Sequence, residues 1–337
     1  MEVKKPLNTT DSTYRFLLTG GCGFIGLSLI DRLLNENPEA NIRILDNLSV
    51  GTREELLEIT STVEKELGVK PSGVEFVEGD IRDYDICTKC CEGINVVVHL
   101  AANTGVAPSI ENPRYDMEAN VTGIFNMLEA ARQNQVKKFI FASSGAAIGE
   151  VTPPIHEDKV PRPVSPYGAS KLAGEAYCSS YYLTFGINTI SLRFANVYGP
   201  LSKHKNSVVA KFFKHAFAGE PLEIYGNGEQ TRDFIYITDL IQAIMLSVNS
   251  DVGGEVFQIA TYRETTVNEI ADKIKKIIEI NTGKNVSVVH GETRLGDVKR
   301  NYSDISKAKR MLGFLPEYTL DMGLQKTFDY FSLKNKR

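Results

Sequence analysis

A glycine-rich segment that joins a strand to a helix constrains this chain more than any other feature. An apolar run at 15–19 leads into Thr19-Gly20-Gly21-Cys22-Gly23-Phe24-Ile25-Gly26, and residues 24–36 follow with the period of an amphipathic helix. Glycines spaced in this way allow a tight turn, close approach of the backbone to a pyrophosphate, and close packing of the helix on the strand. The helix N-terminus adds the positive end of its dipole. We therefore interpret the segment as a dinucleotide-binding loop with contacts from Gly20, Gly23, Phe24, Ile25 and Gly26.

Short β-rich runs alternate with helical segments from residue 14 to about residue 192. We predict strands at 15–19, 41–46, 74–77, 95–99, 137–142 and 187–192. The predicted helices between them cover 24–36, 53–66, 83–91, 113–135 and 166–185. Such alternation is typical of a doubly wound α/β domain with a parallel, Rossmann-type sheet.

The pattern becomes irregular beyond Asn196. There we predict helices at 207–218, 238–249, 266–280, 303–312 and 319–332, and strands at 222–225 and 231–236. Because 337 residues exceed the usual size of one hydrophobic core, we expect two domains. Residues 1–192 are assigned to the nucleotide-binding domain, with 1–13 as a polar extension. Residues 193–337 are assigned mainly to a smaller α/β substrate domain, and 236–260 are the segment expected to return to the first domain if any does.

Side chains after three of the predicted strands are placed to meet a cofactor. Asp46 follows Gly26 by 20 residues, where a carboxylate meets the adenosine ribose hydroxyls. A carboxylate there repels a 2′-phosphate, which favours NAD over NADP; the alternative is that Asp46 only caps the next helix. Asp80 and Ile81 lie at the same edge and are expected at the adenine. The small run Leu100-Ala101-Ala102 is expected beside the cofactor.

A serine, a tyrosine and a lysine form the candidate catalytic group. Ser144 follows the fifth strand, and Tyr167 and Lys171 begin the helix that comes next. Positions i and i+4 share one helix face, so the Lys171 ammonium is expected to stand beside the Tyr167 phenol and favour its ionised form. A base that works near neutral pH needs that change in pKa. The alternative is an ordinary helix with a packed tyrosine and a solvated lysine.

Composition excludes several classes of partner. The net charge of −4 provides no basic field for nucleic acid or for an anionic membrane surface, and no apolar stretch is long enough to span a bilayer. Five cysteines in an uneven arrangement indicate a reducing compartment, so we expect a cytoplasmic protein. Cys87-x-x-Cys90-Cys91 has no second cluster of metal ligands, and we expect free thiols and no metal.

Four segments together resemble the extended short-chain dehydrogenases/reductases. They are the loop from Thr19 to Gly26, the run Asp46-Asn47-Leu48-Ser49-x-Gly51, the serine pair before Gly145, and Tyr167-x-x-x-Lys171. Within this family the chain is most similar to the UDP-glucose 4-epimerase group, over residues 14 to about 330. The resemblance implies cofactor contacts from Asn47, Ser49 and Gly51 as well. It implies an NAD-dependent 4-epimerase that forms a transient 4-keto sugar, with NAD retained.

Several segments of the second half resemble the parts of that family that hold a UDP sugar. The resemblance implies that Asn196, Arg232 and Arg294-Leu295-Gly296-Asp297 lie at the diphosphate and that Tyr225 lies at the uracil and ribose. Two guanidinium groups suit a pyrophosphate, although each Arg is equally able to form a surface ion pair. In the family, the residue four places after the Asp borders the sugar C2 substituent. Here that residue is Asn301, which admits an N-acetyl group, whereas a register shift of one would place Tyr302 there.

Related dehydratases and decarboxylases carry an acid after the strand-end Ser or Thr. Gly145 and Ala146 stand here instead and transfer no proton, which favours plain epimerisation. Ile148 replaces a tyrosine that is common in the family. The alternatives are a nucleotide-sugar dehydratase or decarboxylase, and a non-catalytic dinucleotide sensor.

The family also forms dimers through a four-helix interface, which implies a homodimer built on the helices at 113–135 and 166–185. The apolar residues considered for it are Met117, Val121, Ile124, Leu128, Leu172, Tyr177 and Tyr181. The alternative is that these side chains only cover the sheet.

Overall fold

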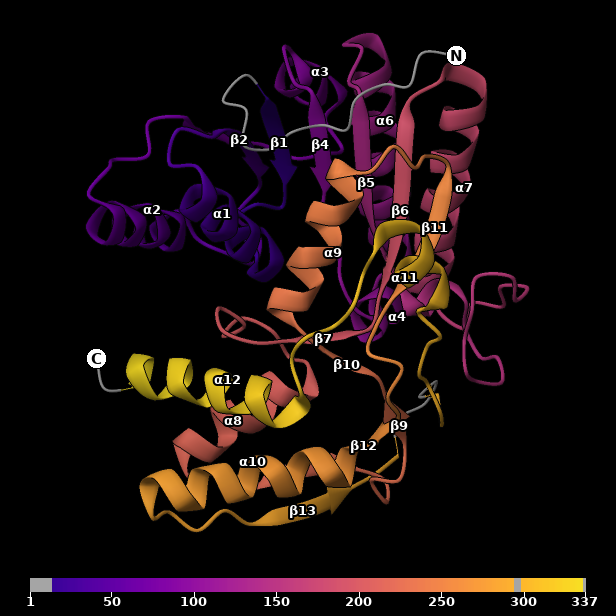
Figure 1. Ribbon diagram of the computed structural model, residues 1–337. Coiled ribbons are helices and arrows are strands. Elements are labelled where there is room, and N and C mark those ends of the chain that lie inside the picture. The colour runs from indigo at the N-terminus through magenta and orange to yellow at the C-terminus, as the bar shows by residue number, and fades with distance from the viewer. Residues whose placement is uncertain (1–13, 294–297, 336–337) are drawn as a thin grey trace.

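A seven-stranded parallel sheet forms the centre of the protein. The structure is a computed structural model that describes residues 14–293 and 298–335 (Figure 1). The strand order is β11-β6-β5-β4-β1-β2-β3, and every neighbouring pair is parallel. The strands are β1 (Arg15–Thr19), β2 (Asn41–Asp46), β3 (Val74–Glu78), β4 (Val96–His99), β5 (Lys138–Ser144), β6 (Asn188–Phe194) and β11 (Glu255–Ile259). The order reverses between β1 and β4, which is where doubly wound sheets bind their ligands.

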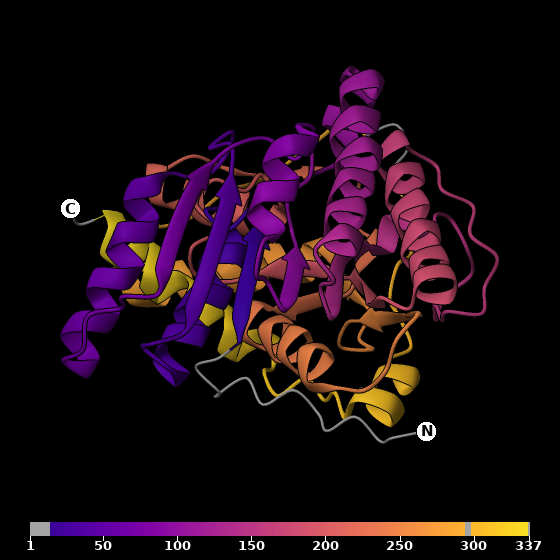
Figure 2. The ribbon, with the colours of Figure 1, turned by 90° about the horizontal axis from the view of Figure 1, so that it is seen from above.

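Helices cover both faces of the sheet (Figure 2). One hydrophobic core joins the sheet to α1 (Phe24–Glu36), α2 (Arg53–Leu67) and α9 (Ile237–Asn249). The other joins it to α3 (Tyr84–Cys91), α6 (Gly123–Gln133) and α7 (Pro166–Phe185). All four residues of β4 are buried, as expected for a central strand covered on both faces. The predicted doubly wound α/β fold is confirmed.

Local sequence signals explain where these helices begin and end. Thr52 and Glu55 form a reciprocal capping box at the start of α2. The Ser165 hydroxyl accepts from the Gly168 N–H at the start of α7, which continues with a proline at its first position. Left-handed glycines end both helices, at Gly68 and Gly186.

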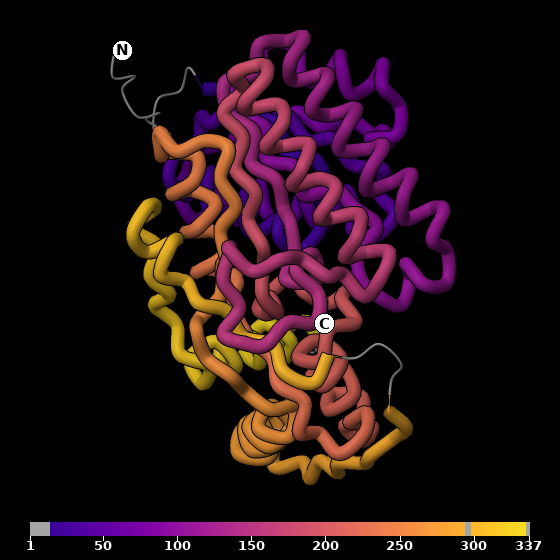
Figure 3. Tube along the Cα trace, turned by 90° about the vertical axis from the view of Figure 1, so that its right-hand side faces the viewer, coloured from indigo at the N-terminus to yellow at the C-terminus, as the bar shows by residue number. Residues whose placement is uncertain are grey.

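The remaining elements lie mostly beyond the carboxyl ends of the strands (Figures 1 and 3). Helices α8 (Val208–Ala218), α10 (Val267–Thr282) and α12 (Leu320–Asn335) pack on one another, and β8 (Leu222–Tyr225) pairs in parallel with β13 (Val288–Gly291). Two small ladders join β7 (Asn196–Tyr198) to β10 (Phe234–Tyr236), and β9 (Thr231–Arg232) to β12 (Thr265–Thr266). Helix α11 (Ser306–Leu312) packs against β11 and α9.

The chain returns to the large sheet after entering this second region. Helix α9 packs on α1, and β11 pairs with β6 along five residues, so residues 237–259 extend the sheet built by the first half of the chain. The first 194 residues therefore do not form the whole of the sheet.

The segment expected to be one helix from 113 to 135 is divided in the structure. It contains α5 (Pro113–Met117), a π-helical turn η1 (Glu118–Thr122) and then α6. A further short helix, α4 (Val106–Glu111), precedes it, and a 3-10 turn, η2 (Gly145–Ala147), follows β5. Single π-turns inside longer helices often occur at functional sites.

Candidate active site

The glycine-rich loop joins β1 to α1 where the sheet order reverses. Gly20 has a φ of 70°, and a Cβ there would lie 2.8 Å from the Ala101 backbone nitrogen. A Cβ on Gly26 would lie 2.5 Å from the Gly20 carbonyl oxygen. No side chain caps the N-terminus of α1 at Gly23, and the first turn of this helix carries no acidic residue, so the positive end of its dipole faces the loop. The loop thus has the backbone approach and the helix end that a pyrophosphate requires.

Thr19 fixes the neighbouring segment after β4. Its hydroxyl oxygen lies 2.8 Å from His99 Nδ1 and accepts from the Ala101 N–H at 3.2 Å. Burial lowers the pKa of His99 to about 3, and the charge of Lys171 lowers it further in the same direction. His99 is therefore neutral at physiological pH and shares a hydrogen bond with the Thr19 hydroxyl through Nδ1. This link holds Leu100, Ala101 and Ala102 beside the glycine loop.

Asp46 is buried at the end of β2 and organises the loop after it. Its carboxylate accepts from the Cys22 N–H at 2.9 Å and from the Leu48 N–H at 2.8 Å. Burial raises the pKa of Asp46, and these two backbone hydrogen bonds oppose the rise. A Cβ on Gly51 would lie only 1.8 Å from the Cys22 carbonyl oxygen, so the turn after Asp46 packs directly on the glycine loop. Asp46 caps no helix here, because Thr52 caps α2.

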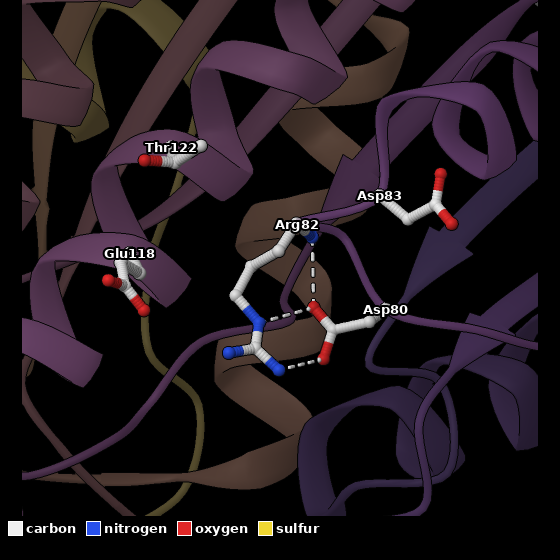
Figure 4. Close-up of a pocket in the computed structure, with 5 residues that line it drawn as sticks. All are labelled: Asp80, Arg82, Asp83, Glu118 and Thr122. Atoms are coloured by element: carbon white, nitrogen blue, oxygen red, sulfur yellow. Dashed lines mark hydrogen bonds and ion pairs between the residues drawn. The ribbon is translucent and has the colours of Figure 1, made fainter.

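An open cavity of about 530 Å³ lies at the edge of the sheet beyond Asp46 (Figure 4). It is lined by Asp80, Arg82, Asp83, Glu118 and Thr122. The Arg82 side chain binds the Asp80 carboxylate through two nitrogens at 2.9 and 3.0 Å, and Asn47 donates to the same carboxylate at 3.0 Å. The hydrogen bond from Arg82 is the main reason that the pKa of Asp80 falls to about 2.

Two of the residues expected at the cofactor, Asn47 and Asp80, therefore contact each other. The sequence reasoning missed Arg82, because an Arg after an Asp gives no sign of a bidentate pair. The Asn47 side-chain oxygen also accepts from the Ser49 N–H at 3.1 Å, which fixes the turn between Asp46 and Gly51. Ile81 is buried and its carbonyl oxygen accepts from Asn126 Nδ2 at 3.0 Å.

The structure brings Ser144, Tyr167 and Lys171 together. Ser144 ends β5, and its hydroxyl oxygen accepts from the Ala146 N–H at 3.2 Å in η2. The hydroxyl hydrogen remains for a bond to the Tyr167 phenol, with which Ser144 also interacts. Lys171 lies one turn after Tyr167 on α7, with its Nζ 5.8 Å from the centre of the tyrosine ring.

The electrostatics of this group differ from the expectation in one respect. Burial raises the pKa of Tyr167 to about 12, whereas the hydrogen bond from Ser144 lowers it. The Lys171 ammonium was expected to depress this pKa, but it is directed at the Ala142 carbonyl oxygen, 2.8 Å away. Lys171 stands one turn from Tyr167 as expected, but the net effect on the pKa of the phenol is a rise, because burial outweighs the hydrogen bond from Ser144. Burial also lowers the pKa of Lys171 to about 8.

A buried polar network behind the catalytic group was missed by the sequence reasoning. Asn120, in the π-turn, accepts from the Asn103 N–H at 2.7 Å and donates to the Asn103 carbonyl at 3.0 Å. The same amide reaches Asp116 at 3.0 Å and Ser170 at 3.1 Å. Ser170 in turn donates to the Tyr167 carbonyl at 2.9 Å. The only sequence signal was an Asn inside a helical segment, which by itself indicates nothing.

The second region brings several of the expected substrate residues to the same end of the sheet. Asn196 begins β7, and Arg232 Nη1 donates to the Thr231 and Val298 carbonyls at 2.6 Å each. The Tyr225 hydroxyl accepts from Lys211 Nζ at 2.8 Å. Arg294 and Asp297 lie outside the residues that the structure describes.

Asn301 comes close to the catalytic strand. Its Nδ2 lies 4.0 Å from the position that a Cβ on Gly145 would take, and Gly145 directly follows Ser144. Tyr302 instead packs against Tyr262, with ring centres 6.1 Å apart. Of these two residues, Asn301 is therefore the one near Gly145, whereas the Tyr302 ring packs against Tyr262.

Comparisons with known proteins identify the family to which the chain belongs. Residues 16–260 match the model of the NAD dependent epimerase/dehydratase family. A putative UDP-glucose 4-epimerase of Methanocaldococcus jannaschii is 37% identical over 325 residues, which cover 95% of this chain and 99% of that protein. The chain belongs to the NAD-dependent epimerase/dehydratase family.

Two solved structures of this family align over nearly their whole length. One is a UDP-N-acetylglucosamine 4-epimerase from Methanobrevibacter ruminantium in complex with UDP-N-acetylmuramic acid. It is 30% identical to this chain with a TM-score of 0.86, and the alignment covers 95% of this chain and 99% of that chain. The other is a Thermus thermophilus UDP-glucose 4-epimerase in complex with NAD, with a TM-score of 0.83, 34% identity, and coverage of 94% and 99%.

Membership of the epimerase/dehydratase family confirms three predictions: the family resemblance, the enzyme class of NAD-dependent nucleotide-sugar epimerases, and NAD as the cofactor. The observed loop fits this cofactor, since the Gly20–Gly26 turn leaves its backbone and the α1 N-terminus open to a pyrophosphate. No helix in the part of the chain that the structure describes is long and apolar enough to cross a membrane. The described cysteines are all free and buried.

Proposed function

We propose that this enzyme is a 4-epimerase of UDP sugars, acting on UDP-glucose and UDP-galactose and on UDP-N-acetylhexosamines. The arrangement that supports it best is the hydrogen-bonded pair of Ser144 and Tyr167 beside the glycine loop, with Lys171 on the same helix face. Such a pair suits proton transfer at a sugar hydroxyl next to a hydride acceptor. The names of the relatives support a UDP sugar as the substrate.

In the proposed reaction, Tyr167 takes the proton from the sugar O4 hydroxyl and later returns it. Ser144 donates to the phenolic oxygen and so stabilises its ionised form against the opposing effect of burial. Lys171, held by the Ala142 carbonyl, is placed to bind the nicotinamide ribose and to keep a positive charge behind the phenol. NAD supplies the acceptor and donor of the C4 hydride, so no net oxidation occurs.

The residues proposed to hold NAD surround the reversal point of the sheet. The glycine loop would bind the pyrophosphate, and Asp46 would bind the adenosine ribose through the remaining lone pairs of its carboxylate. Asp80, Ile81 and Asn47 would lie at the adenine, beside the cavity that Arg82 lines.

Epimerisation is favoured over elimination by the two residues after Ser144. Gly145 and Ala146 carry no acid or base, and a Cβ on Gly145 would meet no atom closer than 3.7 Å. A dehydratase or decarboxylase of this family needs a proton donor at that place. The same catalytic pair argues against a non-catalytic sensor, which has no use for it.

Acceptance of N-acetylated sugars is supported by Asn301. Its amide is small and can hydrogen-bond an acetamido group. Asn301 Nδ2 lies 4.0 Å from the position that a Cβ on Gly145 would take, so a small amide, and not the Tyr302 ring, stands next to Gly145.

We further propose that the enzyme is a cytoplasmic homodimer. The five free thiols fit a reducing compartment. Of the helix residues considered for the interface, Ile124, Leu128 and Tyr181 are buried against the sheet and are excluded from it. Met117 and Tyr177 are exposed, and Phe125 joins them with its ring 5.6 Å from that of Tyr177. Exposed apolar side chains grouped on two helices suit a symmetric interface.

The direct test is incubation of the purified enzyme with UDP-glucose, UDP-N-acetylglucosamine and UDP-glucuronate, with the C4 epimers resolved by chromatography. The proposal predicts interconversion of the first two with no change in product mass. Loss of water or carbon dioxide from any of these sugars would replace it with a dehydratase or decarboxylase. Failure of every sugar to reduce the bound NAD transiently would favour the sensor.

A further inference from the structure

Asp116 is a buried carboxylate for which the reaction as described has no use. It lies on α5 with 1% of its surface exposed. One of its oxygens, Oδ1, accepts from Asn120 Nδ2 at 3.0 Å and from Asn103 Nδ2 at 3.4 Å. The other, Oδ2, is buried with no hydrogen-bond partner among the described residues. A buried carboxylate left half-satisfied is costly unless a cation lies near it.

Asp116 is linked to the part of α7 that carries Lys171, because Asn120 bonds both Asp116, at 3.0 Å, and Ser170, the residue before Lys171, at 3.1 Å. Helix α5 packs on α7, and the charges of Asp116 and Lys171 act on each other. Burial raises the pKa of Asp116, and polar neighbours that include the Asn103 amide, together with the charge of Lys171, counter that rise. Burial lowers the pKa of Lys171 to about 8, and the charge of Asp116 is the strongest influence that opposes this fall.

Other charged and titratable groups around Lys171 come from several elements. Glu175 and Cys178 lie on α7 and raise the pKa of Lys171, whereas Lys205, in the loop after β7, lowers it. Glu175 is already bound by Arg193 through two hydrogen bonds at 2.7 and 2.8 Å, so its charge is largely compensated. His99 at the end of β4 is neutral at physiological pH. Among the described residues, Asp116 is therefore the carboxylate acting on Lys171 that forms no ion pair with an arginine.

Asp116 acts on the phenol as well. Burial is the main reason that the pKa of Tyr167 rises, and the negative charge of Asp116 raises it further. The hydrogen bond from Ser144 opposes both effects. The network that holds Asp116 is firmly attached to α7, because Asn120 bonds Ser170, and Ser170 bonds the Tyr167 carbonyl. Asn120 lies in the π-turn, and its side-chain amide stands between the Asn103 backbone and α7.

We propose that Asp116 is a positioning residue for proton transfer, the buried counter-ion that keeps Lys171 protonated and sets the pH range in which Tyr167 works. The inference rests on the roles proposed above for Tyr167 and Lys171. Removing the negative charge should make both groups lose their protons at lower pH, because the charge favours the protonated form of each.

The test is the pH profile of kcat for Asp116→Asn and Asp116→Glu. The Asn variant should move both limbs of the profile to lower pH, so that its activity falls about threefold or more relative to the wild type on the alkaline side. Asp116→Glu keeps the charge and should keep the limbs in place. Glu111→Gln, an exposed acid on the neighbouring α4, is the matched control and should behave as the wild type.

A second readout does not depend on turnover. Ultraviolet titration of tyrosinate, with the signal of Tyr167→Phe subtracted in each background, should show Tyr167 ionising at lower pH when Asp116 is Asn. If the Asn variant does not fold, Asp116→Ser gives a second neutral side chain that can still accept from Asn120.

Two results would overturn the proposal: unchanged limbs in a folded neutral variant, or equal shifts in the Asn and Glu variants. A wild type that converts no UDP sugar would instead refute the proposed function, while the titration would still decide whether Asp116 sets the ionisation of Tyr167.

Discussion

The proposed proton transfer uses the Tyr167 hydroxyl. We expect Tyr167→Phe to lower kcat by roughly 10² to 10⁴, the usual contribution of a positioned acid–base group. The phenyl ring keeps the packing, so NAD affinity, measured by fluorescence titration, should stay within about twofold of the wild type. A variant with near-wild-type kcat would remove Tyr167 from the mechanism. Tyr177→Phe, on the exposed side of the same helix, is the control.

Lys171 should set the alkaline limit of activity. Burial lowers its pKa to about 8, so the protonated form is present below that pH and is lost as the pH rises through it. If the ammonium is required, kcat of the wild type falls above about pH 8. Lys171→Arg should lose this alkaline limb, because a guanidinium stays protonated above pH 12, even if its maximal rate is lower. An alkaline limb that is identical in the Arg variant would assign it to another group.

At the level of single residues, the sequence located the candidate groups but could not supply their surroundings. Asp46 was expected at the end of β2 and lies there, because strand ends follow from the apolar pattern. The pKa of Tyr167 was expected to fall, yet burial raises it, because helix spacing gives the separation of Tyr167 and Lys171 but not the burial of the phenol. The partners of Asn120 come from three different segments, and no local pattern records them.

Elements with strong periodicity were predicted almost to the residue, and short ones were missed. Helix α7 and strands β1 and β2 have the predicted bounds. Strand β11 was missed because it forms only by pairing with β6, and the 60 residues 195–254 separate the two strands in the chain. The π-turn was missed because one extra residue in a turn leaves the apolar period on both sides intact.

The exposed faces of α6 and α7 lead to a prediction about assembly. Phe125→Asp combined with Tyr177→Asp should convert the proposed dimer to a monomer, because two charges would be placed in an apolar interface. Both side chains are exposed in the single chain, so the fold and NAD binding should survive. Sedimentation velocity measures the change. Ile280→Asp on α10 is the control, since Ile280 is equally apolar and even more exposed. A wild type that sediments as a monomer would contradict the dimer directly.

On the scale of the whole molecule, the proposed sugar-binding part of the site lies where the segment that carries Asn301 meets the segment that follows Ser144. The segment between Ser144 and Tyr167 pairs with the segment that carries Asn301: the Ile155 N–H donates to the Tyr302 carbonyl at 2.9 Å, and the Asp304 N–H donates to the Ile155 carbonyl at 2.8 Å. Asp233 adds a buried anchor, accepting from Thr261 and from the Ser303 N–H. These contacts hold the segment that carries Asn301 in place, so that the Asn301 side chain lies near Gly145.

This geometry makes Asn301→Tyr a test of substrate choice. A phenol at position 301 would project toward Gly145, where Asn301 Nδ2 already lies 4.0 Å from a Cβ position, and would fill the space that an acetamido group needs. We expect kcat/KM for UDP-N-acetylglucosamine to fall by roughly 10² or more, while kcat/KM for UDP-glucose changes by less than about tenfold, because a steric block discriminates through what it excludes.

The matched control is Tyr302→Phe. That ring packs against Tyr262 and away from Gly145, so its substitution should leave the ratio of the two kcat/KM values unchanged. An equal loss on both sugars in Asn301→Tyr would show a general distortion of the site, and a wild type inactive on UDP-N-acetylglucosamine would show that another part of the pocket already excludes the larger sugar. A change of ratio in Tyr302→Phe alone would restore the alternative register, with the aromatic ring at the C2 position.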